Sequence, residues 1–235
     1  MKILAVDSSA AVASVAILSD NTVLGEYFLD NGNTHSETIL PMTESLLSRL
    51  SMTLDEIDLF AVSIGPGSFT GLRIGVATVK GLAFGRNKPC AGISTLEALA
   101  YNLDGVSGIL CPVMDARRNQ VFTALFKSDG KQIERLTPDG AMDLSELDSL
   151  LANYKEPIYL CGDGYALAKE ALTTKTMDTP ERLIPQSAIP VARLALREQK
   201  SGRTVDEAAL APVYLRLSKA ERERAEKEMR KDQNT

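Results

Sequence analysis

The chain has 235 residues, enough for one large domain or two small ones, each with its own hydrophobic core. Apolar residues make up 44% and charged residues 24%, an ordinary globular composition that excludes disorder throughout the chain. The formal net charge of −5 argues against independent binding of nucleic acid, because proteins that grip nucleic acid alone usually carry a basic face.

Three widely separated cysteines, Cys90, Cys111 and Cys161, form no Cys-x-x-Cys pair. Their spacing argues against a zinc site, and their low density suits a reducing compartment, so we expect small buried hydrophobic residues. The first residues lack the pattern of a signal peptide, and no apolar run reaches the ~20 residues of a membrane span. These features predict a soluble, cytoplasmic protein.

Three short strands are predicted at the start of the chain. Residues 2–6, 12–18 and 22–29 are rich in apolar and β-branched side chains. Asp20 and Asn21 supply a turn signal between the second and third runs. Together the three runs predict a three-stranded meander.

A helix is predicted next. Thr34 and Glu37 have the spacing of a capping box, and apolar residues recur at helical spacing up to Leu50. Pro41 conflicts with a regular helix beyond its first turn, so we expect a kink there or a later start. A buried strand at residues 59–64 then leads into a glycine-rich turn and a helix of small residues.

The second half of the chain repeats this order of elements. Its predicted strands are residues 109–114, 120–126 and 131–136, followed by a helix at 144–151, a strand at 158–161, the turn Gly162, Asp163 and Gly164, and a helix from Ala166. Asp7 then corresponds to Asp115, and the turn at Gly65 to the turn at Gly162. The repeat predicts two α/β lobes of like topology.

The lobe boundaries follow from the repeat. We expect an N-terminal lobe at residues 1–105 that carries the partner-binding helices, and a C-terminal lobe at residues 106–216. Residues 217–235 form a charged tail, almost entirely Lys, Arg, Glu and Ala in its first part. Its mixed signs favour a solvated helix or a frayed terminus over a functional basic tail.

The sharpest motif is the turn from Gly65 to Gly71. A strand that ends in glycines and continues into a helix exposes backbone N–H groups and the positive end of the helix dipole, which suits a phosphate or another anion. The alternative is that the glycines only permit a tight turn and close helix packing. The candidate nucleotide or anion loop comprises Asp7, Ser8, Gly65, Gly67 and Ser68.

The single histidine limits the chemistry. His35 alone cannot supply a metal site built on two histidines, and no Gly-x-Ser-x-Gly motif supports a serine triad. We interpret His35 as part of a helix start or an interface. Arg73 and Lys80 lie seven residues apart on the small-residue helix, and glycines four apart on it let another helix approach closely. This face is therefore buried in the core or used by a partner.

Several motifs together closely resemble the TsaB family, also called YeaZ, over essentially the whole chain up to Arg216. They read ILAVDSS at 3–9, HSETILP at 35–41, GPGSFTGLRIG at 65–75, GISTLEALA at 92–100, DARRNQV at 115–121 and PVYLR at 212–216. The resemblance implies the two-lobed fold of actin, Hsp70 and sugar kinases, with duplicated ribonuclease-H-like lobes.

The resemblance also implies a function. TsaB proteins bind and activate TsaD, the catalytic paralogue, which transfers threonylcarbamoyl from threonylcarbamoyl-adenylate to N6 of adenosine 37 in tRNAs reading codons that begin with A. An ATPase, TsaE, joins the assembly, and TsaB proteins alone form homodimers on an overlapping surface. A required cofactor is not expected, weak ATP or ADP binding is left open, and tRNA is reached only through the complex.

A comparison within the family separates enzyme from subunit. TsaD-like enzymes carry a His-x-x-x-His metal pair, and Thr95 and Leu99 stand at the matching positions, where neither can ligate a metal as imidazole does. The resemblance therefore implies a subunit without a catalytic or metal site. It places the partner interface on two helices, at His35, Leu40, Thr43, Leu47, Arg73, Val76, Ala77 and Lys80.

Three other functions remain open on the sequence alone. A metal-dependent, glycoprotease-like peptidase would need a metal and a base that one histidine does not supply. A small-molecule kinase of the same fold could use Asp7 or Asp115 as its base. A nucleotide-sensing dimer would need no catalytic residue.

Overall fold

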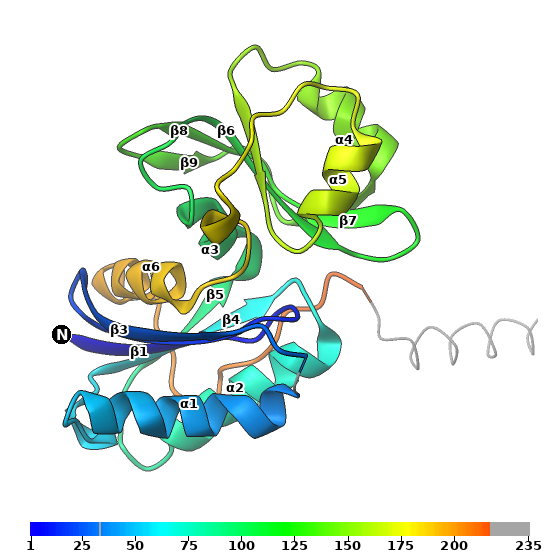
Figure 1. The fold of residues 1–235 in the computed structure, drawn as a ribbon. Helices are drawn as coiled ribbons and strands as arrows, with labels where there is room; N and C mark the ends of the chain where they lie inside the picture. Colours follow the sequence, from blue (N-terminus) through cyan, green and yellow to red (C-terminus); the bar gives the residue numbers. More distant parts are fainter. Residues whose placement is uncertain (33, 217–235) are drawn as a thin grey trace, which may run out of the picture.

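The computed structural model describes residues 1–32 and 34–216. Within them the chain forms two lobes, each a mixed sheet with helices, which Figure 1 shows one above the other. The charged tail at 217–235 lies outside the described residues, so its interpretation stays a prediction.

The first lobe is built on a five-stranded sheet with the order β3-β2-β1-β4-β5. Strands β1 and β4 pair in parallel, as do β4 and β5, while β1, β2 and β3 pair antiparallel. The expected meander is therefore confirmed. The strands are β1 (Lys2–Asp7), β2 (Ala13–Ser19), β3 (Thr22–Leu29), β4 (Leu59–Gly65) and β5 (Cys90–Ser94).

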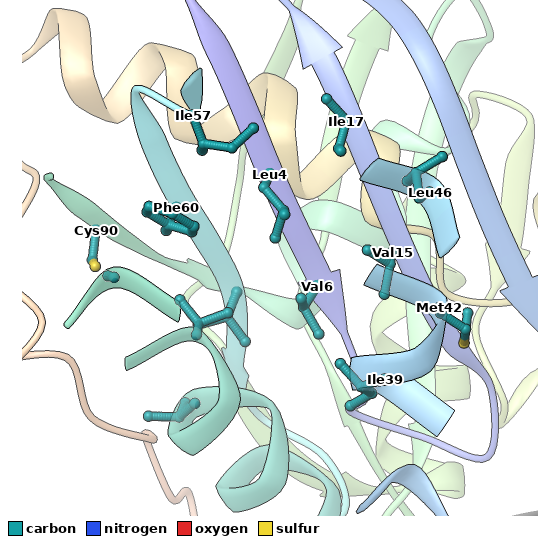
Figure 2. Close-up of a cluster of buried hydrophobic side chains, with 14 of the residues drawn as sticks. Leu4, Val6, Val15, Ile17, Ile39, Met42, Leu46, Ile57, Phe60 and Cys90 are labelled. Atoms are coloured by element: carbon teal, nitrogen blue, oxygen red, sulfur yellow. The ribbon is translucent and has the colours of Figure 1, made fainter. Parts of the chain in front are cut away.

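Both faces of this sheet are covered. Helices α1 (His35–Arg49) and α2 (Phe69–Ala83) lie on one face, and α6 (Ala188–Lys200) lies on the other (Figure 1). Because successive side chains of β1 point to opposite faces of the sheet, Leu4 and Val6 share the face that α1 covers, and Figure 2 shows them in one cluster with Ile39 and Met42. A short 3-10 turn, η1 (Leu54–Glu56), precedes β4.

Helix α1 departs from the expected capping. It begins at His35 and continues through Pro41, so the expected later start is wrong. Thr34 is the N-cap but uses its backbone carbonyl, which accepts from Glu37 N at 3.0 Å, and its side chain makes no cap. Burial of Ile39 and Leu46 against the sheet offsets the hydrogen bond that Pro41 cannot donate.

The second sheet repeats the first. Val113 faces Thr123 and Leu110 faces Phe126 in one register, so β7 and β8 are halves of a single antiparallel partner of β6, interrupted at 124–125. Strands β9 and β10 pair with those halves, and β11 pairs with β6 in parallel. The strands β9 and β10, β7 and β8, β6, and β11 therefore take the places of β3, β2, β1 and β4 in the first sheet. This correspondence confirms the expected duplication. The strands are β6 (Ser107–Asp115), β7 (Gln120–Thr123), β8 (Phe126–Asp129), β9 (Ile133–Arg135), β10 (Gly140–Asp143) and β11 (Ile158–Cys161).

The helices of this half are shorter. Helix α3 (Thr95–Tyr101) leads into β6, and α4 (Leu144–Leu151) and α5 (Tyr165–Ala171) pack together in the second lobe. A 3-10 turn, η2 (Glu181–Leu183), precedes α6. None of these helices within the described ranges is long and apolar enough to cross a bilayer. All three cysteines are buried and free, as expected.

After the second sheet the chain returns to the first lobe. Helix α6 packs on β1, β2, β4 and β5, and Leu210, only 3% exposed, joins the core beneath α2. Val205 exchanges backbone hydrogen bonds with Cys90, at 2.7 and 2.9 Å. The repeat predicted 106–216 for the second lobe, whereas packing assigns α6 and residues 205–213 to the first.

Candidate functional site

A cleft of about 570 Å³ opens between the two lobes. The first lobe contributes the β1–β2 turn at 9–11 and the glycine turn at 66–69. The second contributes the end of β6 at 114–118 and Asp163 of its own glycine turn. The duplicated fold therefore brings corresponding turns of both lobes to one site.

The first glycine turn is held against the β1–β2 turn. A Cβ at Gly67 would overlap the carbonyl oxygen of Ser9, and one at Gly65, with φ +129°, would overlap that of Val213. Ser68 N donates to Ser9 O at 2.7 Å. Its side chain accepts from Gly71 N at 3.2 Å and so caps the start of α2.

Two further glycines let α2 approach Ser8. A Cβ at Gly71 would overlap the Ser8 carbonyl oxygen, and one at Gly75 would overlap Ser8 Oγ. The Ser8 hydroxyl is fully buried and donates to Gly71 O at 2.9 Å. Close packing thus explains these glycines, and anion binding at the turn stays a prediction.

Asp7 is 1% exposed, and both of its carboxylate oxygens are engaged. Oδ1 accepts from the amide of Ser9 at 2.9 Å and its hydroxyl at 2.6 Å, and Oδ2 accepts from Ser63 Oγ at 2.5 Å. Burial raises the pKa of this carboxyl, and the hydrogen bonds from Ser63 and Ser9 oppose that rise. Neither Asp7 nor Ser8 lines the cleft, so contact with a nucleotide would require the turn to open.

The second lobe presents charge to the cleft. Asp115 accepts from Arg117 N at 2.6 Å and pairs with its guanidinium at 3.2 Å. Desolvation in the cleft wall raises the pKa of Asp163 to about 6, and the charge of Asp115 adds to the rise. Arg117 and Arg118, both at positive φ, give the cleft a basic rim that sequence reasoning missed.

The end of the described chain closes one side of the cleft. The Tyr214 ring lies 4.8 Å from that of Phe69, and its hydroxyl accepts from Arg73 Nε at 2.8 Å. Arg216 donates to Ala116 O at 2.9 Å and to Gln120 Oε1. Sequence reasoning used these positions only as a family motif, since contacts about 100 or more residues apart leave no local pattern.

The predicted partner residues divide by exposure. Leu40 is 45% exposed, and Arg73 and Ala77 are also exposed. His35 is partly buried, with Nε2 at 2.7 Å from Ala10 O. Lys80 is partly buried and donates to Ala208 O at 2.9 Å and to Leu210 O at 3.1 Å.

Three of the predicted partner residues are in the core instead. Thr43, Leu47 and Val76 are 1%, 8% and 4% exposed. They lie on the inward stripes of α1 and α2, where they present little surface to a partner, and their role in an interface stays a prediction. The exposed stripe of α2 runs through Ala77 and Gly81 to Phe84, which follows the helix and is 73% exposed. Sequence reasoning did not name Phe84 as a contact.

The duplicated lobes and the cleft between their glycine turns define the class of two-lobed proteins with the actin, Hsp70 and sugar-kinase fold. The family model "TsaD: tRNA N6-adenosine threonylcarbamoyltransferase" matches residues 30–221. The TsaB protein of Bacillus subtilis is 33% identical over 94% of this chain and 96% of its own length. That of Haemophilus influenzae is 30% identical over 92% and 94%.

Solved structures agree with the sequence comparison. A Pseudomonas aeruginosa protein described as similar to peptidase YEAZ superposes with a TM-score of 0.80 at 25% identity, over 92% of this chain and 99% of that one. The chain belongs to the TsaB (YeaZ) family of tRNA threonylcarbamoyladenosine biosynthesis proteins.

Proposed function

We propose that this chain is a non-catalytic cytoplasmic subunit that binds and activates TsaD, together with TsaE, for threonylcarbamoyl transfer to N6 of adenosine 37 in tRNA. The observation that carries the proposal is the exposed face of α1 and α2. Leu40 on α1, Ala77 and Gly81 on α2, and Phe84 directly after α2 are apolar or small, yet they face outward. Small exposed side chains along a helix permit a partner helix to approach closely, and Phe84 offers an apolar anchor.

The two positions that match the histidine pair of TsaD-like enzymes support a role without catalysis. Thr95 and Leu99 lie on α3 and are 0% and 1% exposed, enclosed by the core rather than facing the cleft. Among residues 1–32 and 34–216 no cluster of three His, Cys, Asp or Glu side chains could hold a metal. Asp7, the best candidate for a metal–phosphate contact, is already fully hydrogen-bonded.

The same face accounts for the proposed homodimer. A second copy would cover the exposed stripe of α2 when TsaD is absent, so the homodimer and the heterodimer compete. The proposal requires no cofactor. Weak ATP or ADP binding would fall in the inter-lobe cleft, and tRNA would be reached through the complex.

The test is a reconstitution with purified TsaD, TsaE, threonylcarbamoyl-adenylate and tRNA. The chain alone should leave tRNA unmodified, and adding it to TsaD and TsaE should restore modification. Full turnover by TsaD and TsaE without it would refute the proposal.

A single substitution locates the surface. Ala77→Glu places a charge on the exposed stripe and should weaken TsaD binding by roughly 30-fold or more, the ~2 kcal/mol typical of a hot-spot loss. The matched control is Ala152→Glu, on an exposed alanine that follows α4 in the second lobe. Unchanged TsaD affinity of Ala77→Glu, with the control also unchanged, would move the interface away from α2.

A further inference from the structure

Residues 205–216, here called the strap, run from the first lobe to the second. The strap begins inside the first lobe, where Val205 pairs with Cys90 and Leu210 enters the core. Lys80 of α2 donates to the carbonyl oxygens of Ala208 and Leu210. This part of the strap is therefore fixed to α2 and β5.

At the cleft the strap is still bound to the first lobe. Val213 N donates to Ile64 O at 2.7 Å, beside the glycine turn. Tyr214 stacks on Phe69 and accepts from Arg73, whose guanidinium lies 3.9 Å from the Phe69 ring centroid. These contacts fix Tyr214 to the start of α2.

Two residues later the strap is bound to the second lobe. Arg216 donates to Ala116 O at 2.9 Å and to the Gln120 side chain, and its guanidinium lies 5.6 Å from the Phe122 ring centroid. A chain extends by at most about 3.5 Å per residue, so the stretch from Tyr214 to Arg216 spans no more than about 10 Å. The lobes cannot separate there without breaking one of the two attachments.

The lobes also meet at α3, in a different way. Leu96, Leu99 and Leu103 share one apolar core with Leu110, Phe126 and Cys161 of the second lobe. Figure 1 shows α3 between the two sheets, with the strap, in orange, reaching past the glycine turn toward the second lobe. Separating α3 from the second lobe would expose this core, whereas releasing Arg216 exposes one cation and a few polar groups.

We propose that the strap is an inter-lobe latch, with the α3 core as the hinge and Arg216 as the releasable contact. The strap sets the width of the cleft whether or not a partner is bound. This inference does not rest on the proposed function, because every contact that carries it lies within one chain.

Spin-label distance measurement on the full chain tests the latch. Ser48→Cys on α1 and Ser145→Cys on α4 place labels on exposed positions of the two lobes. The three native cysteines are buried, so labelling is selective. Dilution with unlabelled protein removes distances between chains.

In this background Arg216→Ala should shift the distance distribution to longer and broader values. Arg203→Ala is the matched control, because Arg203 pairs with Glu198 on the first lobe and does not reach the second. Tyr214→Ala removes the side-chain anchor nearest the cleft, while Val213 and Leu210 still hold the strap on the first lobe, so it should give a smaller shift in the same direction. The combined variant should add little to Arg216→Ala alone, because release of Arg216 already opens the latch.

The proposal fails if both single variants, shown to be folded by circular dichroism, superimpose on the parent distribution. It also fails if Arg203→Ala produces the same shift, because the effect would then not be specific to the inter-lobe contact. Tyr214→Ala decides the outcome if Arg216→Ala does not fold.

Discussion

The contact between α2 and Ser8 makes a quantitative prediction at Gly75. An added Cβ would overlap Ser8 Oγ and lie 3.3 Å from Val62 Cγ2. The Ser8 hydroxyl would have to leave its buried bond to Gly71 O, a loss of about 1 kcal/mol, and overpacking costs about 1–3 kcal/mol more. Alanine regains about 1 kcal/mol of helix propensity, so Gly75→Ala should destabilise the chain by about 1–3 kcal/mol.

Gly81 supplies the control on the same helix. It is exposed, and an added Cβ there meets nothing within 4 Å. Only the propensity effect remains, so Gly81→Ala should stabilise the chain by about 1 kcal/mol. The two substitutions are chemically identical and should have opposite signs.

The free energy of unfolding in urea measures the difference. The chain has no tryptophan, so far-UV circular dichroism is the probe, at one fixed protein concentration for all variants. Removing the hydroxyl should rescue the clash: in a Ser8→Ala background, Gly75→Ala should cost much less than in the parent. Equal stability of the two glycine variants, or no coupling between Gly75 and Ser8, would refute the packing argument.

Two further predictions concern stability. Asp148 accepts hydrogen bonds from Thr173 and Thr174, which lower its pKa from 3.8 to about 2. The ionised carboxylate of Asp148 therefore stabilises the fold above pH 3.8, and this contribution is lost as the pH falls through about 2. Asp148→Asn should lower the free energy of unfolding at pH 7 and match the parent near pH 2. A difference in unfolding free energy that stays constant with pH would contradict this. Leu210→Ala should lower the free energy of unfolding by about 2–5 kcal/mol in the same assay, because Leu210 is buried in the first-lobe core. A change below about 1 kcal/mol would show that the strap is not part of that core.

Local patterns predicted the elements that depend on local physics. The strand at 22–29, the helix at 144–151 and the strand at 158–161 have the bounds that the sequence predicts. Hydrophobic periodicity identifies such segments because one face of each must be buried. The order of elements was enough to predict the duplicated sheets.

Long-range packing limited the rest of the prediction. The sequence could not show that α6 packs on the first sheet, or that Arg216 contacts Ala116, 100 residues away. At α1, the doubt about Pro41 obscured the helix phase, so the sequence did not show that Thr43 and Leu47 face the core. Asp7 was expected at a nucleotide site because it ends a strand beside the glycine turn. The sequence did not show that Ser9 and Ser63 hydrogen-bond its carboxylate, and the nucleotide contact stays a prediction.

The return of α6 to the first sheet has a consequence for synthesis on the ribosome. The second sheet and its helices form one continuous stretch, so they can fold as soon as that stretch has emerged. The face of the first sheet that carries Ile3, Leu18 and Leu59 stays uncovered until α6 follows. The lobe translated first is therefore completed last, and its apolar face stays exposed in the interval.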